Sequence, residues 1–369
     1  MKLAFCLFNY FPYGGLQQDF LTILNTCITR GHQIDVYTMQ WEGDQPENIH
    51  LHCHPQKAMT NHGRAKAFSE AMQKIFSTIS YDVVIGFNKM PGLDIYFAAD
   101  HCFIKDVHKS LSFLPRYLTY HALEKAVFEP KACTKILVLT ETQKKDFIKY
   151  YQTSPERFFL LPPYIDLNFQ NIENYTRARE SFRIELGLSP EDKMILMVAS
   201  FFSTKGLDRA LKALAALPFP AHLFIVGGDD PAPYLSFIKK SGIAQYVHFM
   251  SAQKNVMPFY AAADIFFHPA YREAGGKVLL EALMARLPIL TTAVCGHSIH
   301  VTNANAGIVL SSPFDQTQCD QALFSLLNNK DILENFKKNA DFYVKSHNFF
   351  ELGKIVADII GETAIAQER

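Results

Sequence analysis

The chain has 369 residues, 49% hydrophobic and 20% charged, which is enough apolar material for two globular α/β domains. Its 36 basic residues balance 36 acidic ones, which excludes an overall field that attracts nucleic acid or an anionic membrane to the whole surface. The sequence shows no apolar run long enough to span a membrane and no signal-peptide pattern, so we expect a cytoplasmic protein.

The first half of the chain alternates apolar strands with amphipathic helices. A buried strand is predicted over 2–8 and a helix over 16–30, with the Gly14-Gly15 turn at the helix start. Free backbone N–H groups at such a start suit a phosphate or a closely approaching sugar, although a plain tight turn fits equally well. Asp19 lies one turn into this helix and either points toward a ligand or simply suits the positive end of the helix.

A short strand over 49–55 carries three histidines on one face, because His50, His52 and His54 alternate with apolar residues. Zinc binding is one interpretation. Three imidazoles on a flat strand lack the convergent geometry of a zinc site, so we expect a polar edge strand and no metal.

Further strands are predicted over 82–87, 94–100 and 135–140. Asp100 ends the second of these, at the strand end where open α/β sheets bind ligands. It either faces a ligand crevice or acts as a local cap.

The segment 101–129 mixes cations with aromatic rings. Lys105, Lys109 and Arg116 are interleaved with phenylalanine and tyrosine, a combination that suits the surface of an anionic membrane. Acidic residues in the same segment leave an ordinary amphipathic region with a solvated face as an equal alternative.

A domain boundary is predicted at Pro162-Pro163, which can continue neither a helix nor a central strand. A second array of strands and helices follows, with strands at 193–200, 221–226 and 307–310. The sequence thus predicts an α/β fold of two Rossmann-like domains that face each other across a cleft. Their predicted extents are 1–165 and 166–348, and a terminal helix occupies 349–369.

Lys205 and Gly206 stand at the start of a helix in the second array. A lysine there opposes the helix dipole, which makes a purely structural role unnatural, but it can reach a diphosphate held by the same helix start.

The segment 264–295 concentrates the chemistry of the chain. It is predicted to form a strand, a helix over 277–285 and another strand, with Gly275 and Gly276 at the helix start as a phosphate cradle. Glu273 precedes the helix and Glu281 lies inside it, so two carboxylates flank the cradle. By spacing alone, a solvated Glu281 and an ordinary glycine loop are the better interpretation.

The residues around this pair change that interpretation. The segment HPAYREAGGKVLLEA resembles the signature of retaining GT-B glycosyltransferases of family 4, in which it holds a sugar nucleotide. Segments in order along nearly the whole chain are similar to the lipopolysaccharide core glucosyltransferases of Gram-negative bacteria. They are FCLFNYFPYGGLQQDF, RGH, VYTMQWEGD, NHGR, GFNKMPGLDIYFAAD, PERFFLLPP, KGLDR, HPAYREAGGKVLLEA and LPILTTAVCG.

This resemblance implies a GT-B enzyme on the cytoplasmic face of the inner membrane that moves glucose from UDP-glucose to the inner-core heptose of lipopolysaccharide, with retention. The UDP-sugar is then a substrate, and no cofactor is implied. No Asp-x-Asp occurs in the chain, in agreement with a metal-independent site. By the same resemblance, the terminal helix crosses back to the first domain.

The resemblance also implies roles for individual residues. Glu281 binds the ribose, Glu273 binds hydroxyls of the donor sugar, and Gly15 approaches the donor from the first domain. Asp19, Asp100 and Glu273 are the expected catalytic residues, and Asp100 orients the acceptor hydroxyl. The diphosphate is held by Lys205, Gly275 and Gly276, and Ala274 is a further donor-binding residue.

One departure from the family pattern concerns a cation. Many members carry an arginine upstream of Lys205 or directly before it, where this chain has Val198-Ala199-Ser200 and Ser203-Thr204. Lys277, where an apolar residue is usual, is our candidate for the missing charge. Two alternatives stay open: a transferase or epimerase for another sugar nucleotide, and a non-catalytic nucleotide-sugar binding module. A nicotinamide dehydrogenase is disfavoured because Gly-x-Gly-x-x-Gly is absent.

Overall fold

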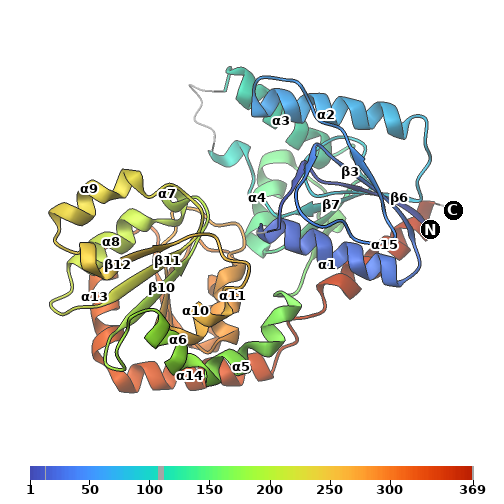
Figure 1. Cartoon of the computed structure of the whole chain (residues 1–369). Coiled ribbons are helices and arrows are strands. Elements are labelled where there is room, and N and C mark those ends of the chain that lie inside the picture. Colours follow the sequence, from blue (N-terminus) through green and yellow to red (C-terminus); the bar gives the residue numbers. More distant parts are fainter. Residues whose placement is uncertain (13, 107–111, 368–369) are drawn as a thin grey trace. The chain divides into compact units, whose positions relative to one another are not determined.

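The computed structural model describes residues 1–12, 14–106 and 112–367 (Figure 1). The chain divides into two compact units. Unit 1 comprises Met1–Pro162 together with Glu351–Arg369, and unit 2 comprises Pro163–Phe350.

Unit 1 is built on a seven-stranded parallel sheet with the order β5-β3-β1-β6-β7-β8-β9. Its central strands are buried along nearly their whole length, as expected for parallel strands covered by helices on both faces. The order reverses between β1 and β6. The strands are β1 (Lys2–Cys6), β3 (Gln33–Thr38), β5 (His50–Cys53), β6 (Val83–Gly86), β7 (Ile95–Ala98), β8 (Lys135–Val138) and β9 (Phe158–Leu160), beside a small pair, β2 (Asn9–Tyr10) and β4 (Gln40–Trp41).

Five α-helices and two 3₁₀ turns are described in unit 1. Helix α4 begins at a capping box, in which the Thr140 hydroxyl accepts a hydrogen bond from the Gln143 backbone N–H and the Gln143 side chain accepts one from the Thr140 backbone N–H. The helices are α1 (Gly15–Thr29), α2 (Asn61–Phe76), α3 (Pro115–Phe128), α4 (Glu141–Tyr151) and α15 (Leu352–Gln367), and the 3₁₀ turns are η1 (Ile104–Asp106) and η3 (Pro155–Arg157).

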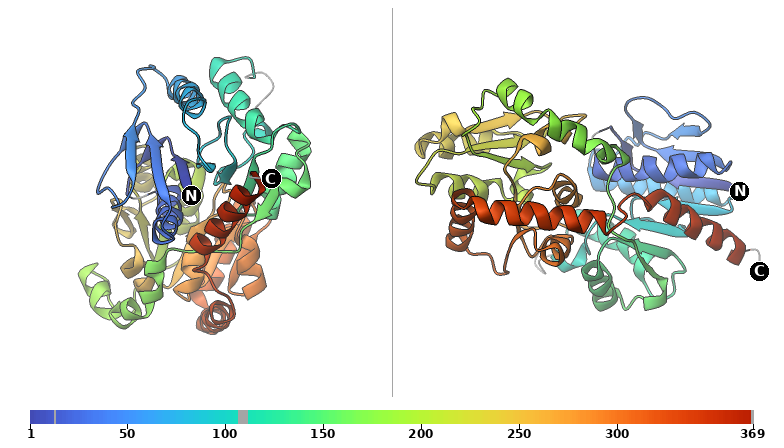
Figure 2. Two further views of the ribbon diagram at one scale, coloured as in Figure 1. Left: turned by 90° about the vertical axis from the view of Figure 1, so that its right-hand side faces the viewer. Right: turned by 90° about the horizontal axis from the view of Figure 1, so that it is seen from below.

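The last helix of the chain, α15, packs along the first helix, α1 (Figures 1 and 2). Arg30 and Asp358 form an ion pair of 2.7 Å between them. A Cβ at Gly353 would lie only 2.2 Å from the Thr26 hydroxyl oxygen, so glycine permits the close approach of the two helices.

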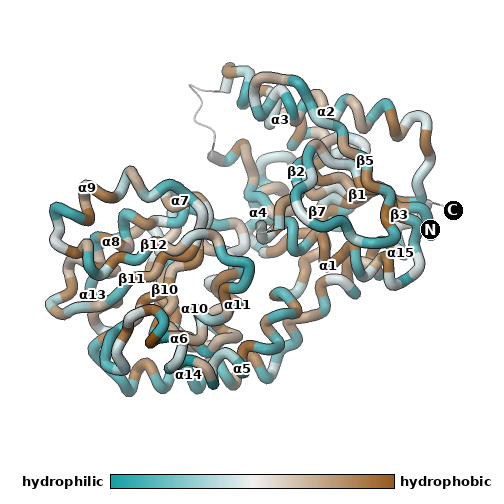
Figure 3. Tube along the Cα trace, viewed as in Figure 1, coloured by the Kyte–Doolittle hydropathy of each residue, from teal (hydrophilic) through white to brown (hydrophobic). Residues whose placement is uncertain are grey.

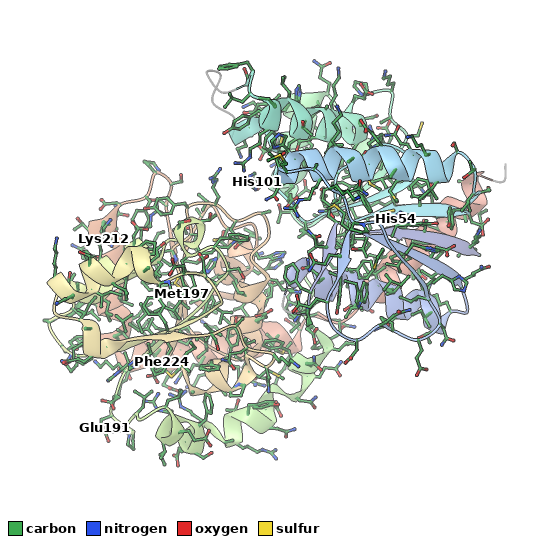
Figure 4. The ribbon with its side chains drawn as sticks, turned by 45° about the horizontal axis from the view of Figure 1, so that its top comes forward. His54, His101, Glu191, Met197, Lys212 and Phe224 are labelled. Carbon is green, nitrogen blue, oxygen red and sulfur yellow. The ribbon has the colours of Figure 1, made fainter. Side chains whose placement is uncertain are left out.

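Unit 2 contains a six-stranded parallel sheet with the order β12-β11-β10-β13-β14-β15, which is the doubly wound Rossmann order. Apolar residues colour β10 and β11 brown in Figure 3, and Figure 4 labels Met197 and Phe224 in this core. Glu191 and Lys212 lie at the exposed periphery. The strands are β10 (Met194–Val198), β11 (His222–Val226), β12 (Val247–Met250), β13 (Ile265–His268), β14 (Ile289–Thr292) and β15 (Gly307–Leu310).

Helices cover both faces of this second sheet. They are α5 (Ile172–Arg177), α6 (Arg179–Glu185), α7 (Phe202–Lys205), α8 (Leu207–Ala215), α9 (Ala232–Lys240), α10 (Met257–Ala262), α11 (Lys277–Met284), α12 (Ser298–Ala304), α13 (Gln316–Asn328) and α14 (Lys330–Lys345), with 3₁₀ turns η4 (Leu167–Asn171) and η5 (Ala244–Tyr246).

Two details of the first unit bear on the sequence predictions. The segment Phe158–Leu160, just before the predicted boundary and not predicted as a strand, forms the edge strand β9 paired with β8. At the opposite edge, His52 and His50 on β5 lie 2.8 and 3.4 Å from one carboxylate oxygen of Asp35. Within the described residues, no three His, Cys, Asp or Glu side chains converge to hold a metal ion.

Candidate active site

The centre of the candidate site lies where the order of the second sheet reverses, between β10 and β13. The segment after β10 ends at Lys205, and the loop after β13 carries Glu273. The Lys205 ammonium lies 2.5 Å from the Glu273 carboxylate. Loops at such a reversal form the ligand crevice of open α/β sheets, so these two charges stand at the expected place.

Glu273 also accepts a hydrogen bond of 3.2 Å from the imidazole Nε2 of His268, a buried residue at the end of β13. Burial alone would raise the pKa of Glu273, but the hydrogen bond from His268 and the charge of Lys205 outweigh it and lower the pKa to about 2. Glu273 is therefore a fixed anion at neutral pH. The sequence interpretation treated His268 only as part of a strand.

Gly206 allows the two loops to meet. Its φ is +78°, and a Cβ there would lie 2.1 Å from the carbonyl oxygen of Pro269. No residue with a side chain fits this close approach without displacing backbone. The glycine after Lys205 thereby holds that lysine against the loop of Glu273.

The glycine cradle, Gly275 and Gly276, follows Glu273 in the chain at the start of α11. Gly276 caps the N-terminus of α11 with a φ of +87°, and no side chain caps the first turn of this helix. The Gly275 carbonyl accepts a 2.7 Å hydrogen bond from the backbone of His297, which ties the cradle to the start of α12. Ala274, half-buried, connects the cradle to Glu273. A helix start without a side-chain cap and with glycine beside it suits a phosphate.

Glu281 is buried on the second turn of α11 and accepts a 2.8 Å hydrogen bond from the Tyr260 hydroxyl. This overturns the interpretation of Glu281 as a solvated helix residue. Burial, reinforced by the charge of Glu281, raises the pKa of Tyr260 well above its usual value, so the phenol stays protonated and donates. Tyr260 was not predicted as a site residue.

His297 is a further residue that sequence reasoning missed. It is buried, and its Nδ1 has no hydrogen-bond partner among the described residues. Burial lowers its pKa to about 3, so the ring is neutral. The only sequence signal was its position five residues after β14, the strand that follows α11.

Unit 1 carries the other predicted site residues. Gly15 is the exposed first residue of α1, and a Cβ there would meet nothing within 4 Å. Asp19 lies one turn later and is buried. Asp100 follows β7 and lines a cavity of about 560 Å³. Among the described residues, neither Gly15 nor Asp19 lines this cavity.

The three cations expected at a membrane fall into different environments. Lys105 forms a 2.7 Å ion pair with Asp146, and Arg116 is exposed on the first turn of α3 and lines the cavity. Lys109 lies outside the described residues. Within the described part of the chain, no helix has the length and apolar character needed to cross a membrane.

Lys277, the candidate for a missing cation, is the first residue of α11, and its ammonium lies 5.9 Å from the centre of the Tyr164 ring. A different cation, Arg209, approaches the carbonyl oxygens of Pro269 and Ala270 at 3.2 and 3.0 Å. Arg209 is thereby engaged in supporting the loop of Glu273.

Family comparisons agree with this geometry. The model for glycosyl transferases group 1 matches residues 178–341, and that for Glycosyltransferase Family 4 matches residues 13–169. The lipopolysaccharide glucosyltransferase WaaG of Escherichia coli (strain K12) is 43% identical over 368 residues, 98% of each chain. A D-inositol 3-phosphate glycosyltransferase of Corynebacterium aurimucosum is 27% identical over 61% of this chain and 56% of its own length.

Solved structures extend the comparison to the fold. The crystal structure of WaaG is 42% identical, with a TM-score of 0.93 over 97% of this chain and 99% of that one. A sucrose-phosphate synthase from Thermosynechococcus elongatus, 16% identical with a TM-score of 0.80 over 99% and 100% of the two chains, shares the fold alone. These matches confirm the predicted fold class. The chain is a glycosyltransferase with the GT-B fold and belongs to the family of the lipopolysaccharide glucosyltransferase WaaG.

Proposed function

We propose that this glycosyltransferase moves glucose from UDP-glucose to the inner-core heptose of lipopolysaccharide, with retention and without a metal ion. The relative named as a lipopolysaccharide glucosyltransferase matches over nearly its whole length, which supports the same reaction class here. The observation that carries the donor assignment is the ion pair of Lys205 and Glu273 beside the glycine cradle of α11.

The arrangement of unit 2 fits a nucleotide sugar in extended form. Glu281, oriented by Tyr260, takes the ribose hydroxyls, and the helix start at Gly276 takes the diphosphate. Lys205 and Glu273 are neighbours at 2.5 Å, as required if the cation binds the β-phosphate and the carboxylate binds hydroxyls of the hexose attached to it. Ala274 and Gly275 let the backbone approach that phosphate closely.

Bond breaking then depends on charge stabilisation. Negative charge that builds on the departing UDP is met by Lys205 and by the N–H groups at the start of α11. The acceptor hydroxyl attacks from the face of the leaving group, and a phosphate oxygen takes its proton, which preserves the anomeric configuration. Because the pKa of Glu273 is about 2, this carboxylate accepts hydrogen bonds from the sugar and is no proton donor.

The acceptor binds in unit 1 in this proposal, where Asp100 lines the cavity and orients the attacking hydroxyl. Gly15 approaches the donor from the open first turn of α1, with Asp19 one turn behind it.

Peripheral attachment to the inner face of the cytoplasmic membrane is part of the proposal. Phe113 and Leu118 are 70% and 54% exposed beside Arg116, so two apolar side chains and a cation are available to lipid at the start of α3. Replacing Lys105, Lys109 and Arg116 together is expected to weaken binding to anionic vesicles. Unchanged vesicle binding would contradict a role for these three cations in membrane attachment.

The deciding experiment measures transfer of radiolabelled sugar from UDP-glucose, UDP-galactose and UDP-GlcNAc to core-truncated lipopolysaccharide, with and without EDTA. Transfer of glucose alone, unaffected by EDTA, is the expected result. Failure with all three donors contradicts the specific assignment, and transfer of another sugar selects the rival donor. Acceptor-free conversion of the donor would favour an epimerase.

The compensating role of Lys277 is tested in the same assay. Lys205→Ala is expected to abolish turnover, and Lys277→Ala is expected to weaken UDP binding and slow turnover to a smaller degree. Loss with the first variant and no change with the second would show that Lys277 does not replace the missing arginine.

A further inference from the structure

The cavity of unit 1 combines two kinds of recognition chemistry. Side-chain amides, among them Asn61 and Asn88, stand beside apolar and aromatic residues such as Phe103 and Tyr120. Amides pair with sugar hydroxyls, and rings pack against the apolar face of a pyranose. Its volume of about 560 Å³ is in the range of small-molecule pockets.

The same cavity carries an excess of positive charge that a neutral sugar does not require. Arg64, Lys89 and Arg116 line it, together with Asp100 and His101, the latter labelled in Figure 4. Lys89 is already neutralised, because its ammonium lies 2.7 Å from the fully buried carboxylate of Glu124 and 3.0 Å from the His101 carbonyl. Two arginines then face one carboxylate, Asp100.

Arg64 and Arg116 are both available to bind an anion. Arg64 lies on the first turn of α2 and bonds only the neutral side-chain oxygen of Asn61 within the described chain. Arg116 lies on the first turn of α3, where no side chain caps the helix start. Both are exposed, and helices α2 and α3 pack together in unit 1 (Figure 1). Two positive helix ends therefore add to the two guanidinium charges.

We infer that this cavity is an acceptor subsite for an anionic sugar, in which Arg64 and Arg116 hold a carboxylate or phosphate group while the amides hold hydroxyls. The guanidinium fork matches the paired oxygens of either anion, and the excess positive charge favours an acceptor that carries an anionic group beside its neutral sugars. This inference deepens the proposed function and rests on it for the identity of the acceptor.

The subsite is tested by binding, without turnover. Calorimetry compares mannose 6-phosphate and glucuronate, as sugar phosphate and sugar carboxylate, with neutral methyl mannoside. Wild-type protein is expected to bind at least one anionic sugar about tenfold more tightly, as one charge-assisted contact provides. Arg64→Gln and Arg116→Gln each lose this preference. The anionic sugar that binds more tightly shows whether the subsite prefers a phosphate or a carboxylate.

Lys66→Gln is the matched control. Lys66 lies two residues after Arg64 on α2, pairs with Glu70 at 3.9 Å and does not line the cavity. It should retain the wild-type preference. Equal binding of charged and neutral sugars by the wild type overturns the inference, as does an unchanged preference in both arginine variants. If Arg116→Gln retains the anion preference and weakens only binding to phosphatidylglycerol vesicles, Arg116 serves membrane attachment alone and the subsite as stated is wrong.

A parallel transfer assay with de-acylated core oligosaccharide separates this inference from the proposed function. Anion preference without glucose transfer supports the subsite and counts against the proposed acceptor. Glucose transfer without anion preference supports the proposed function and removes the subsite.

Discussion

Glu273→Gln tests how much the ionised carboxylate of Glu273 contributes to the stability of unit 2. The pKa of Glu273 falls from 4.5 to about 2 because hydrogen bonding to His268 and the charge of Lys205 outweigh the opposing effect of burial. This difference between the two pKa values corresponds to about 3 kcal/mol of stabilisation of the folded state by the ionised form. Glutamine keeps the shape and removes the charge, so unit 2 should lose about this amount at pH 7.

The direction of the pKa shift determines how the stabilisation by Glu273 changes with pH. A carboxylate with a depressed pKa in the folded state stabilises fully above its unfolded value near 4.5, and the contribution is lost as the pH falls toward 2. The difference between wild type and Glu273→Gln should therefore be constant from pH 7 to 5 and shrink to about 1 kcal/mol at pH 3. Amide hydrogen exchange in β13 and α11, corrected for intrinsic rates, measures this difference locally.

Glu334→Gln provides the control within unit 2. Glu334 pairs with Lys337 at 2.8 Å on the surface of α14, where its side chain is 61% exposed, so the change should cost less than about 0.5 kcal/mol. Equal protection in wild type and Glu273→Gln at pH 7, or a loss in Glu334→Gln as large as in Glu273→Gln, would refute this reasoning.

Two further predictions concern unit 2. Tyr260→Phe removes the 2.8 Å hydrogen bond to Glu281, so calorimetry should show UDP binding weakened about tenfold or more, while turnover at saturating donor is largely kept; unchanged UDP affinity would contradict the ribose role of Glu281. Gly206→Ala meets the Pro269 carbonyl at 2.1 Å and should lower the thermal midpoint by several degrees, whereas the control Gly228→Ala, whose Cβ approaches its nearest neighbour at 3.4 Å, should not.

The fold was largely readable because parallel strands buried on both faces appear as unbroken apolar runs. Met194–Val198 and Ile265–His268 are of this kind, and both were predicted as strands. Phe158–Leu160 was not, because only the first of its three residues is buried and two prolines follow shortly after. An edge strand of that length has too little pattern to be separated from a linker.

Only part of the candidate site could be predicted from the sequence. Glu273 and Lys205 could be chosen because glycines mark their loops in the sequence. Tyr260, 21 residues before Glu281, and His268, hidden in an apolar strand, reach the carboxylates only through packing. Side chains that orient a site from another element leave no local pattern.

Ion pairs between distant residues could not be predicted from the sequence either. Lys105 was interpreted as available to lipid, yet its partner Asp146 lies 41 residues later on α4. Local composition shows which charges a segment carries, whereas the fold decides which of them are neutralised.

The packing of α15 on α1 has a consequence for how the chain acquires its structure during synthesis. All of unit 2 is translated before Leu352–Gln367, so its sheet can close while the first unit still lacks a covering helix. Until then, the surface of α1 on which α15 packs stays open to water, and so do Val356 and Ile360, which are buried in the folded chain. A nascent chain that has emerged from the ribosome only as far as residue 350 would therefore carry a complete second unit and a first unit without its covering helix, and the first unit would be the part that needs protection from aggregation.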